Sequence, residues 1–72
     1  MYIHVKTYAG QRKEEVKRLN EDHLEVRVRE PAQNNLANGR VIEIIKNLYP
    51  GALARLINGH QSPSKLFSVD GN

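Results

Sequence analysis

The chain has 72 residues, with eleven Lys and Arg against eight Asp and Glu, a net charge of +3 and no cysteine. This length predicts a single domain over residues 1–72 with a thin core, and the lack of cysteine excludes disulfides, thiolate catalysis and cysteine-ligated zinc. No apolar run approaches the roughly 20 residues that span a bilayer. The first residues also lack a signal-peptide pattern, so we expect a cytoplasmic protein without membrane contact.

Two stretches of the N-terminal half have the alternation of half-buried strands. Residues 2–7 place Ile3, Val5 and Thr7 on one face and polar or aromatic side chains on the other. Residues 23–29 alternate Leu or Val with charged residues, and the Glu-Pro pair that follows ends the strand because proline offers no N–H to a ladder.

The segment between these strands, residues 11–19, is mostly charged. Val16 and Leu19 are its apolar residues, and their spacing allows one helical turn. A charged, extended segment at a sheet edge is equally compatible with this composition. We favour the extended form, because residues 20–22 are turn formers that lead directly into the next strand.

The clearest pattern in the chain is a helical apolar stripe within residues 34–51. Its members follow helical spacing and are Ala37, Val41, Ile44, Ile45 and Leu48. The side chain of Asn34 or Asn35 is expected to cap the start of this helix, since Asn accepts from the unpaired amides of a first turn. Pro50 is expected to end it.

The remaining residues predict two more strands joined by a polar turn. Residues 52–58 form the first strand, residues 59–64 the turn and residues 65–69 the last strand, with Phe67 and Val69 inward. Two registers stay open for the first of these strands, with either Leu53 and Ile57 or Ala54 and Leu56 inward. The order of elements predicts a two-layer α+β fold, a small mixed β-sheet of about four strands with one main helix packed on one face.

Three short motifs occur together in this order: Val-Arg-Glu-Pro at residues 28–31, Ala37-Asn38 at the helix start, and Gly59-x-x-Ser62-x-x-Lys65. Their combination resembles the YggU family of uncharacterised small proteins over nearly the whole chain. The resemblance implies a mixed sheet with helices packed on one side, and it assigns no biochemical activity.

The chain also departs from this family. Asn35 and Leu36 stand where the family usually has Gly and Lys, and Pro63 stands where many members have Arg. A second helix after the last strand, common in the family, is absent from the pattern. Asn35 can replace Gly because Asn tolerates left-handed backbone geometry. Two cations are missing, which weakens any inherited anion-binding site.

The best candidate site joins the helix start to the last turn. Its residues are Asn35, Asn38, Gly59, Ser62, Ser64 and Lys65. A helix start presents unpaired amides and partial positive charge, which favour an anion, and the turn supplies two hydroxyls and an ammonium. This site requires both segments to lie at one edge of the sheet. The structural alternative is that Asn38 bonds the neighbouring loop while Ser62 and Lys65 shape a hairpin.

Other chemistry finds little support. Ser62-x-x-Lys65 matches an acyl-enzyme motif but lacks the accompanying elements. The three histidines are too far apart for a local metal motif, and no nucleophile with a base and an orienting group can be assembled. An RNA-stacking sheet face with Tyr2, Lys6 and Arg27 is interrupted by Glu25, so cross-strand ion pairs are favoured there. We expect no catalysis, no cofactor and no metal.

These features predict a binding or accessory module that contacts a phosphate, RNA or another polyanion through the helix start and residues 59–65. The alternative is a protein–protein interaction domain that pairs through an exposed strand edge, formed by residues 11–19 or 66–69. Either reading suits a monomer or a weak dimer.

Overall fold

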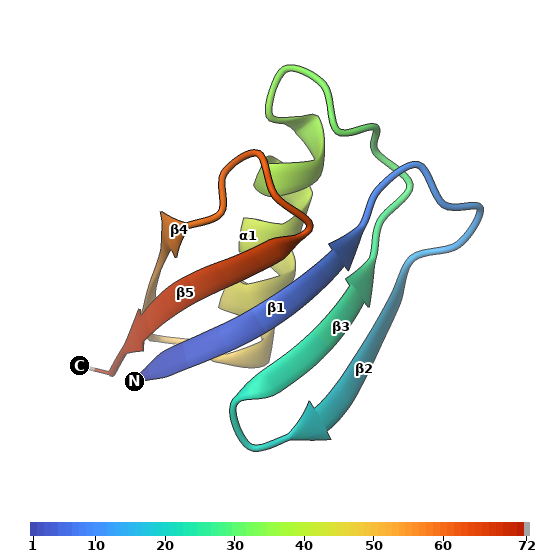
Figure 1. Cartoon of the computed structure of the whole chain (residues 1–72). Coiled ribbons are helices and arrows are strands. Elements are labelled where there is room, and N and C mark those ends of the chain that lie inside the picture. Colours follow the sequence, from blue (N-terminus) through green and yellow to red (C-terminus); the bar gives the residue numbers. More distant parts are fainter. Residues whose placement is uncertain (72) are drawn as a thin grey trace.

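The protein is represented by a computed structural model, in which the structure of residues 1–71 is described. Its elements in chain order are β1 (Tyr2–Tyr8), β2 (Glu15–Asn20), β3 (His23–Arg27), α1 (Leu36–Leu48), β4 (Leu53–Asn58) and β5 (Ser64–Asp70) (Figure 1). The strands form one mixed sheet in the order β2-β3-β1-β5-β4. The predicted α+β class is confirmed. The sheet has five strands rather than about four, because the charged segment after β1 is extended and adds β2.

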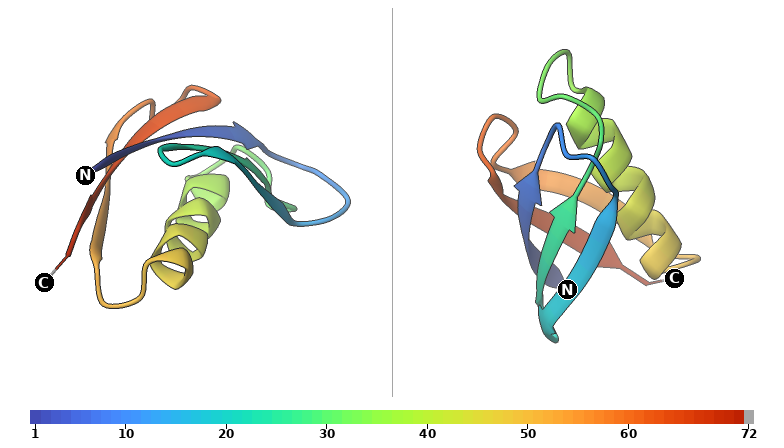
Figure 2. Two further views of the ribbon diagram at one scale, coloured as in Figure 1. Left: turned by 90° about the horizontal axis from the view of Figure 1, so that it is seen from below. Right: turned by 90° about the vertical axis from the view of Figure 1, so that its right-hand side faces the viewer.

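The first strand of the chain lies at the centre of the sheet. β1 runs parallel to β3, with His4 opposite His23, and antiparallel to β5, with Ile3 opposite Phe67. α1 lies against one face of the curved sheet and leaves the other face uncovered (Figure 2). Within residues 1–71, no helix combines the length and hydropathy of a membrane span.

The alternation of the strands builds the core between sheet and helix. Its largest fully buried side chains are Phe67, Ile3, Leu24, Ile45, Val5, Val26, Val28 and Val41. β3 ends at Arg27, two residues before the predicted end, yet Val28 still donates its amide to the carbonyl of Tyr8 at 2.9 Å. In β4 the open register resolves with Ala54 inward, while Leu53 and Ile57 are exposed.

The predicted edge at residues 66–69 is wrong. β5 is bonded on both sides, by β1 and by β4, so the two edges of the sheet are β2 and β4. Sequence alone had no means of ordering the strands. The other predicted edge, within residues 11–19, is confirmed as β2.

The helix forms where its stripe predicted, with two differences. Leu48 is 40% exposed, because Tyr49 and Ala52, in the turn after the helix, pack against the core at this end. The side chain of Asn35 makes no capping bond to the helix amides. Asn34 and Asn35 instead adopt positive φ values of 54° and 60°, and this left-handed turn lets upstream carbonyls accept from the first amides.

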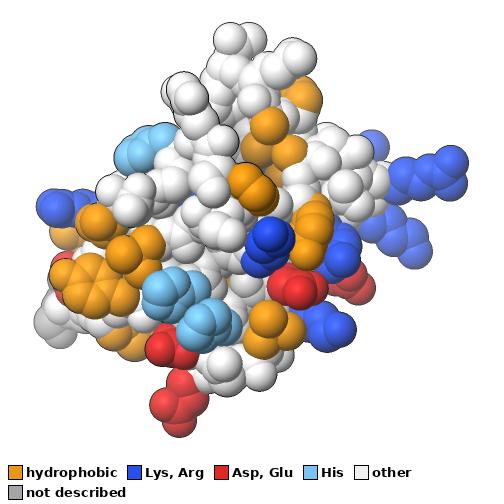
Figure 3. Space-filling view, in the orientation of Figure 1, with side chains coloured by type: hydrophobic (Ala, Val, Ile, Leu, Met, Phe, Trp, Pro, Cys, Tyr) orange, Lys and Arg blue, Asp and Glu red, His pale blue; other side chains and the backbone are white. Residues whose placement is uncertain are grey.

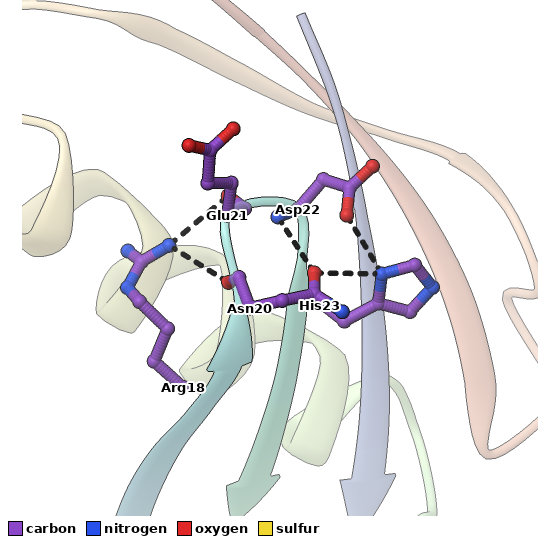
Figure 4. Close-up of polar contacts among 5 residues, drawn as sticks. All are labelled: Arg18, Asn20, Glu21, Asp22 and His23. Atoms are coloured by element: carbon purple, nitrogen blue, oxygen red, sulfur yellow. Dashed lines mark hydrogen bonds and ion pairs between the residues drawn. The ribbon is translucent and has the colours of Figure 1, made fainter.

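Polar contacts tie β2 and its flanks to the rest of the molecule. Arg40 of α1 makes a two-pronged ion pair with Glu14, with Nη2 2.8 Å from Oε2. Arg18 donates to the hydroxyl of Tyr49 at 2.9 Å and to the carbonyl of Glu21 at 3.1 Å. The turn after β2 is closed by its own side chains (Figure 4). β2 is therefore anchored at both of its ends.

Candidate functional site

The two segments of the predicted site lie together at one edge of the sheet. The hairpin loop between β4 and β5 reaches the end of β1, where the amide of Thr7 donates to the carbonyl of Pro63 at 2.7 Å. The same loop meets the first turn of α1, where Asn38 Nδ2 donates to the carbonyl of His60 at 2.8 Å. The juxtaposition that the site requires is present in the structure.

Lys65 is the least expected part of this arrangement. Only 6% of the residue is exposed, because it shares the inward face of β5 with the core residues. Its ammonium donates to the carbonyls of Gly59 at 2.8 Å and Ser62 at 2.7 Å, and to that of His60 at 3.4 Å. An ammonium has three N–H groups, so its donors are fully used by the loop. Burial lowers the pKa of Lys65 from its ordinary value.

Asn38 fixes the loop from the helix side. It is 9% exposed, and its amide nitrogen also lies 3.4 Å from Oδ1 of Asn35. Asn38 and Lys65 therefore approach the carbonyl of His60 from two elements. Each of these residues has the structural role that was the alternative to direct ligand contact.

The shape of the loop depends on Gly59. Its φ is +85°, and a Cβ at this position would lie 2.3 Å from the carbonyl oxygen of Ser64. Only glycine fits both conditions. The amide of Ser64 donates to Oγ of Ser62 at 3.1 Å, which closes the turn locally.

A groove of about 660 Å³ lies between this loop and the start of α1. Its lining residues are Thr7, Ala9, Ala32, Asn34, Asn35, Ala37, Asn38, His60, Gln61, Ser62, Pro63 and Lys65. Four of the six predicted residues thus line it. Gly59 and Ser64 instead line a second hollow, of about 610 Å³, which includes His4 and Lys6 on the uncovered face of the sheet.

The groove carries one formal charge and it is positive. None of its lining residues is Asp or Glu, Lys65 has no carboxylate partner among residues 1–71, and the first turn of α1 has no acid. The field of an ammonium that no acid neutralises extends into the groove. The helix start adds partial positive charge of the same sign.

Sequence reasoning missed several groove residues. The side chains of Asn34, His60 and Gln61 make no hydrogen bond or ion pair within residues 1–71, so their polar atoms are available to a ligand. The hydroxyl of Thr7 is buried in the groove wall with no partner among the described residues. The signal was their position, since Asn34 precedes the predicted residue Asn35, and His60 and Gln61 lie within the predicted segment 59–65 although neither was singled out.

The groove offers donors and positive charge. Within residues 1–71, no hydrogen bond joins a serine hydroxyl to a histidine ring, and no group of three or more metal-ligating side chains occurs. The chemistry that these contacts favour is hydrogen bonding to an acceptor-rich, negatively charged group.

The uncovered face of the sheet is the other surface on which aromatic and basic side chains lie together. Figure 3 shows acidic, basic, histidine and apolar side chains intermixed on it. Arg27 lies over the ring of Tyr8 at 4.6 Å and pairs with Glu15 and Glu25, each at 3.6 Å. His4 and His23 stack with ring centroids 4.6 Å apart. The ion pair of Arg27 with Glu15 joins neighbouring strands, as favoured from the sequence, while Lys6 and Lys17 on the same face make no ion pair within residues 1–71.

Fold and groove together define a small α+β protein with a positively charged groove at one edge of its sheet. No protein-family model matches the chain, and no solved structure matches it. The resemblance to the YggU family stays a prediction that rests on the three short motifs.

Proposed function

We propose that this protein is a binding module whose groove takes a phosphate group of a nucleic acid strand, without catalysis. The observation that carries the proposal is the charge of the groove: one buried ammonium, that of Lys65, and no carboxylate. A phosphate in the groove gains Coulomb attraction from Lys65 and from the start of α1, and no acid is among the lining residues to repel it.

Direct contacts come from the rim. The donors of Lys65 and of the Asn38 amide are held by loop carbonyls, so these two residues shape the groove and supply its field. Asn34, His60 and Gln61 are exposed and have free polar atoms, and side chains of this kind bind phosphate oxygens in protein–nucleic acid complexes. Such contacts bind the phosphate backbone of the nucleic acid, so we expect little preference for its base sequence.

The affinity is expected to be modest and to fall only gradually as salt rises. One groove engages few phosphates, so the release of counterions is small, while the net charge of +3 supports the encounter. We further propose a cytoplasmic location, which the absence of cysteine favours.

The test is an amide chemical-shift titration with a short mixed-sequence RNA at low salt, repeated with inorganic phosphate. We expect saturable shifts at residues 34–39 and 59–65 that weaken as salt rises. Shifts at these residues with phosphate alone would assign the site to the free anion. No shifts, or shifts confined to the uncovered sheet face, would overturn the proposal.

A matched pair of variants sharpens the test. Asn34→Asp adds one negative charge at the groove rim and breaks no described bond, since the Asn34 side chain makes none. Asn47→Asp adds the same charge at the exposed far end of α1. A like charge near the bound phosphate costs roughly 1 kcal/mol, which is about fivefold in affinity. Equal affinities for the two variants would place the ligand elsewhere.

A further inference from the structure

β2 presents an open edge to solvent. It is the outermost strand of the sheet, bonded to β3 alone, and all six of its residues are exposed. Val16, its second residue, is 39% exposed. An unpaired strand edge offers a row of backbone donors and acceptors to another chain. The side chains of the strand determine whether such pairing is favoured or prevented.

The charges around Val16 are antisymmetric. The sequence is Glu14-Glu15-Val16-Lys17-Arg18, so two acids precede the valine and two bases follow it. If a second copy of this strand is placed antiparallel to the first with a two-fold axis at Val16, each acid of one copy lies opposite a base of the other. An edge of one charge sign would repel a second copy of itself, whereas this edge is complementary to itself.

From this pattern we propose that two copies of the chain associate through an antiparallel pairing of β2 with β2, centred on Val16. The pairing places Glu15 opposite Lys17 of the partner subunit, and the two-fold axis produces the same contact again. The two sheets then continue into one, with both helices on the same side. This inference is independent of the proposed function, since it uses the opposite edge of the described sheet from β4 and none of the groove residues.

The register follows from the faces of the strand. Lys17 pairs with Glu25 and Glu15 with Arg27 in the β2–β3 ladder, so both lie on the uncovered face, while Val16 lies opposite Val26 on the helix side. Residues directly opposite each other in an antiparallel pair lie on the same face of the sheet. In a two-fold symmetric pairing of β2 with itself, the residue at the axis must therefore lie opposite its own copy. A centre at Glu15 or at Lys17 opposes like charges. The centre at Val16 opposes unlike charges and pairs valine with valine.

The groups that would make these contacts are free to do so. Glu15 has a 63% exposed side chain and a loose pair with Arg27 at 3.6 Å, and Lys17 makes no ion pair within residues 1–71. The next residues outward are already engaged, Glu14 by Arg40 and Arg18 by Tyr49. These contacts hold the edge in place before association, which lowers the ordering cost.

The extent of the pairing is short. β2 begins at Glu15, and a register shift between Arg18 and Asn20 interrupts its ladder at the other end. Bulges of this kind end strand pairing. Within β2, a pairing centred on Val16 covers residues 15–17, and this short contact predicts a weak dimer that forms at high protein concentration and is weakened by salt.

Charge reversal tests the proposal by sedimentation equilibrium at low salt. Glu15→Lys opposes lysine to Lys17 of the partner subunit, and Lys17→Glu opposes glutamate to Glu15 of the partner subunit. Each variant alone is expected to lose dimer affinity by about tenfold or more, because two attractive cross-strand pairs become repulsive. An equimolar mixture of the two variants restores attraction in both contacts, and so does the double variant.

The restoration in the mixture separates a lost contact from a lost fold. Lys46→Glu is the control, since it changes the same charge on an exposed residue of α1 and should dimerise as the natural chain does. A natural chain that stays monomeric at millimolar concentration would overturn the proposal. Single variants that dimerise normally, or a mixture that stays monomeric, would overturn it equally.

Discussion

Replacing Lys65 with methionine tests whether the carbonyl cage holds the hairpin loop in place. Methionine keeps the buried apolar stem and removes the ammonium, so the change leaves little cavity and acts on the hydrogen bonds. His60 keeps the bond from Asn38, and the carbonyl of Gly59 keeps the amide of Ser62 at 3.0 Å. The carbonyl of Ser62 has Lys65 as its described partner and loses it.

The expected cost follows from these contacts. The two short bonds, at 2.7 Å and 2.8 Å, have a charged donor and together contribute about 3 kcal/mol at the low end of the usual range. Removing the ammonium also returns part of the cost of burying it, since burial lowers the pKa of Lys65. We therefore expect Lys65→Met to lower the free energy of unfolding by about 2 kcal/mol, or Tm by roughly 8–16 °C.

Urea denaturation followed by circular dichroism measures this difference. Lys46→Met serves as the control, because Lys46 is exposed and the change should stay within about 0.5 kcal/mol. Buried ionic groups can sometimes be replaced by apolar ones without loss. Lys65→Met with natural or higher stability would show that the cage does not stabilise the fold, and the reasoning above would be refuted.

Two further predictions concern backbone geometry and pH. Gly59→Ala should lower the free energy of unfolding, measured by urea denaturation, by about 2 kcal/mol or more, because a Cβ would lie 2.3 Å from a backbone oxygen at φ +85°. The control Gly39→Ala, on the open helix surface, should raise it by about 0.5–1 kcal/mol. Equal effects of the two substitutions would contradict this prediction. Arg40 holds the pKa of Glu14 below its ordinary value of 4.5, so the pair stabilises the fold fully above about pH 4.5 and less as pH falls through the lowered value. Urea midpoints from pH 6 to about pH 2.5 should therefore fall less steeply in Glu14→Gln than in the natural chain, and parallel curves would exclude this role.

Local patterns in the sequence predicted most of the fold. The alternation in β1 and β3 and the stripe in α1 report directly which side chains face the core, and the extended form of β2 followed from the turn after it. The same alternation put Lys65 on the inward face with Phe67 and Val69. A lysine in that position suggests a surface residue, and only the folded loop supplies the carbonyls that make its burial tolerable.

The features that the sequence did not predict depend on contacts between distant segments. Strand order decides which edges are open, and no local pattern reports it. The capping of α1 depends on two consecutive left-handed residues, Asn34 and Asn35, that bring upstream carbonyls to the helix amides. The sequence predicted the two segments that form the walls of the groove. The donors of Lys65 and Asn38 bind loop carbonyls, which is the structural alternative to ligand contact given in the sequence analysis.

The place of β1 at the centre of the sheet has a consequence for folding during synthesis. β1 is made first, and its two neighbours are β3 and β5, the second of which ends at Asp70. The contact between the amide of Val69 and the carbonyl of Met1, at 2.8 Å, closes a loop of almost the whole described chain. A ribosome-bound chain that lacks β5 would leave one side of β1 unpaired and Phe67 missing from the core. Topologies with such distant pairings fold slowly, and the complete sheet is expected to form only after β5 has been made.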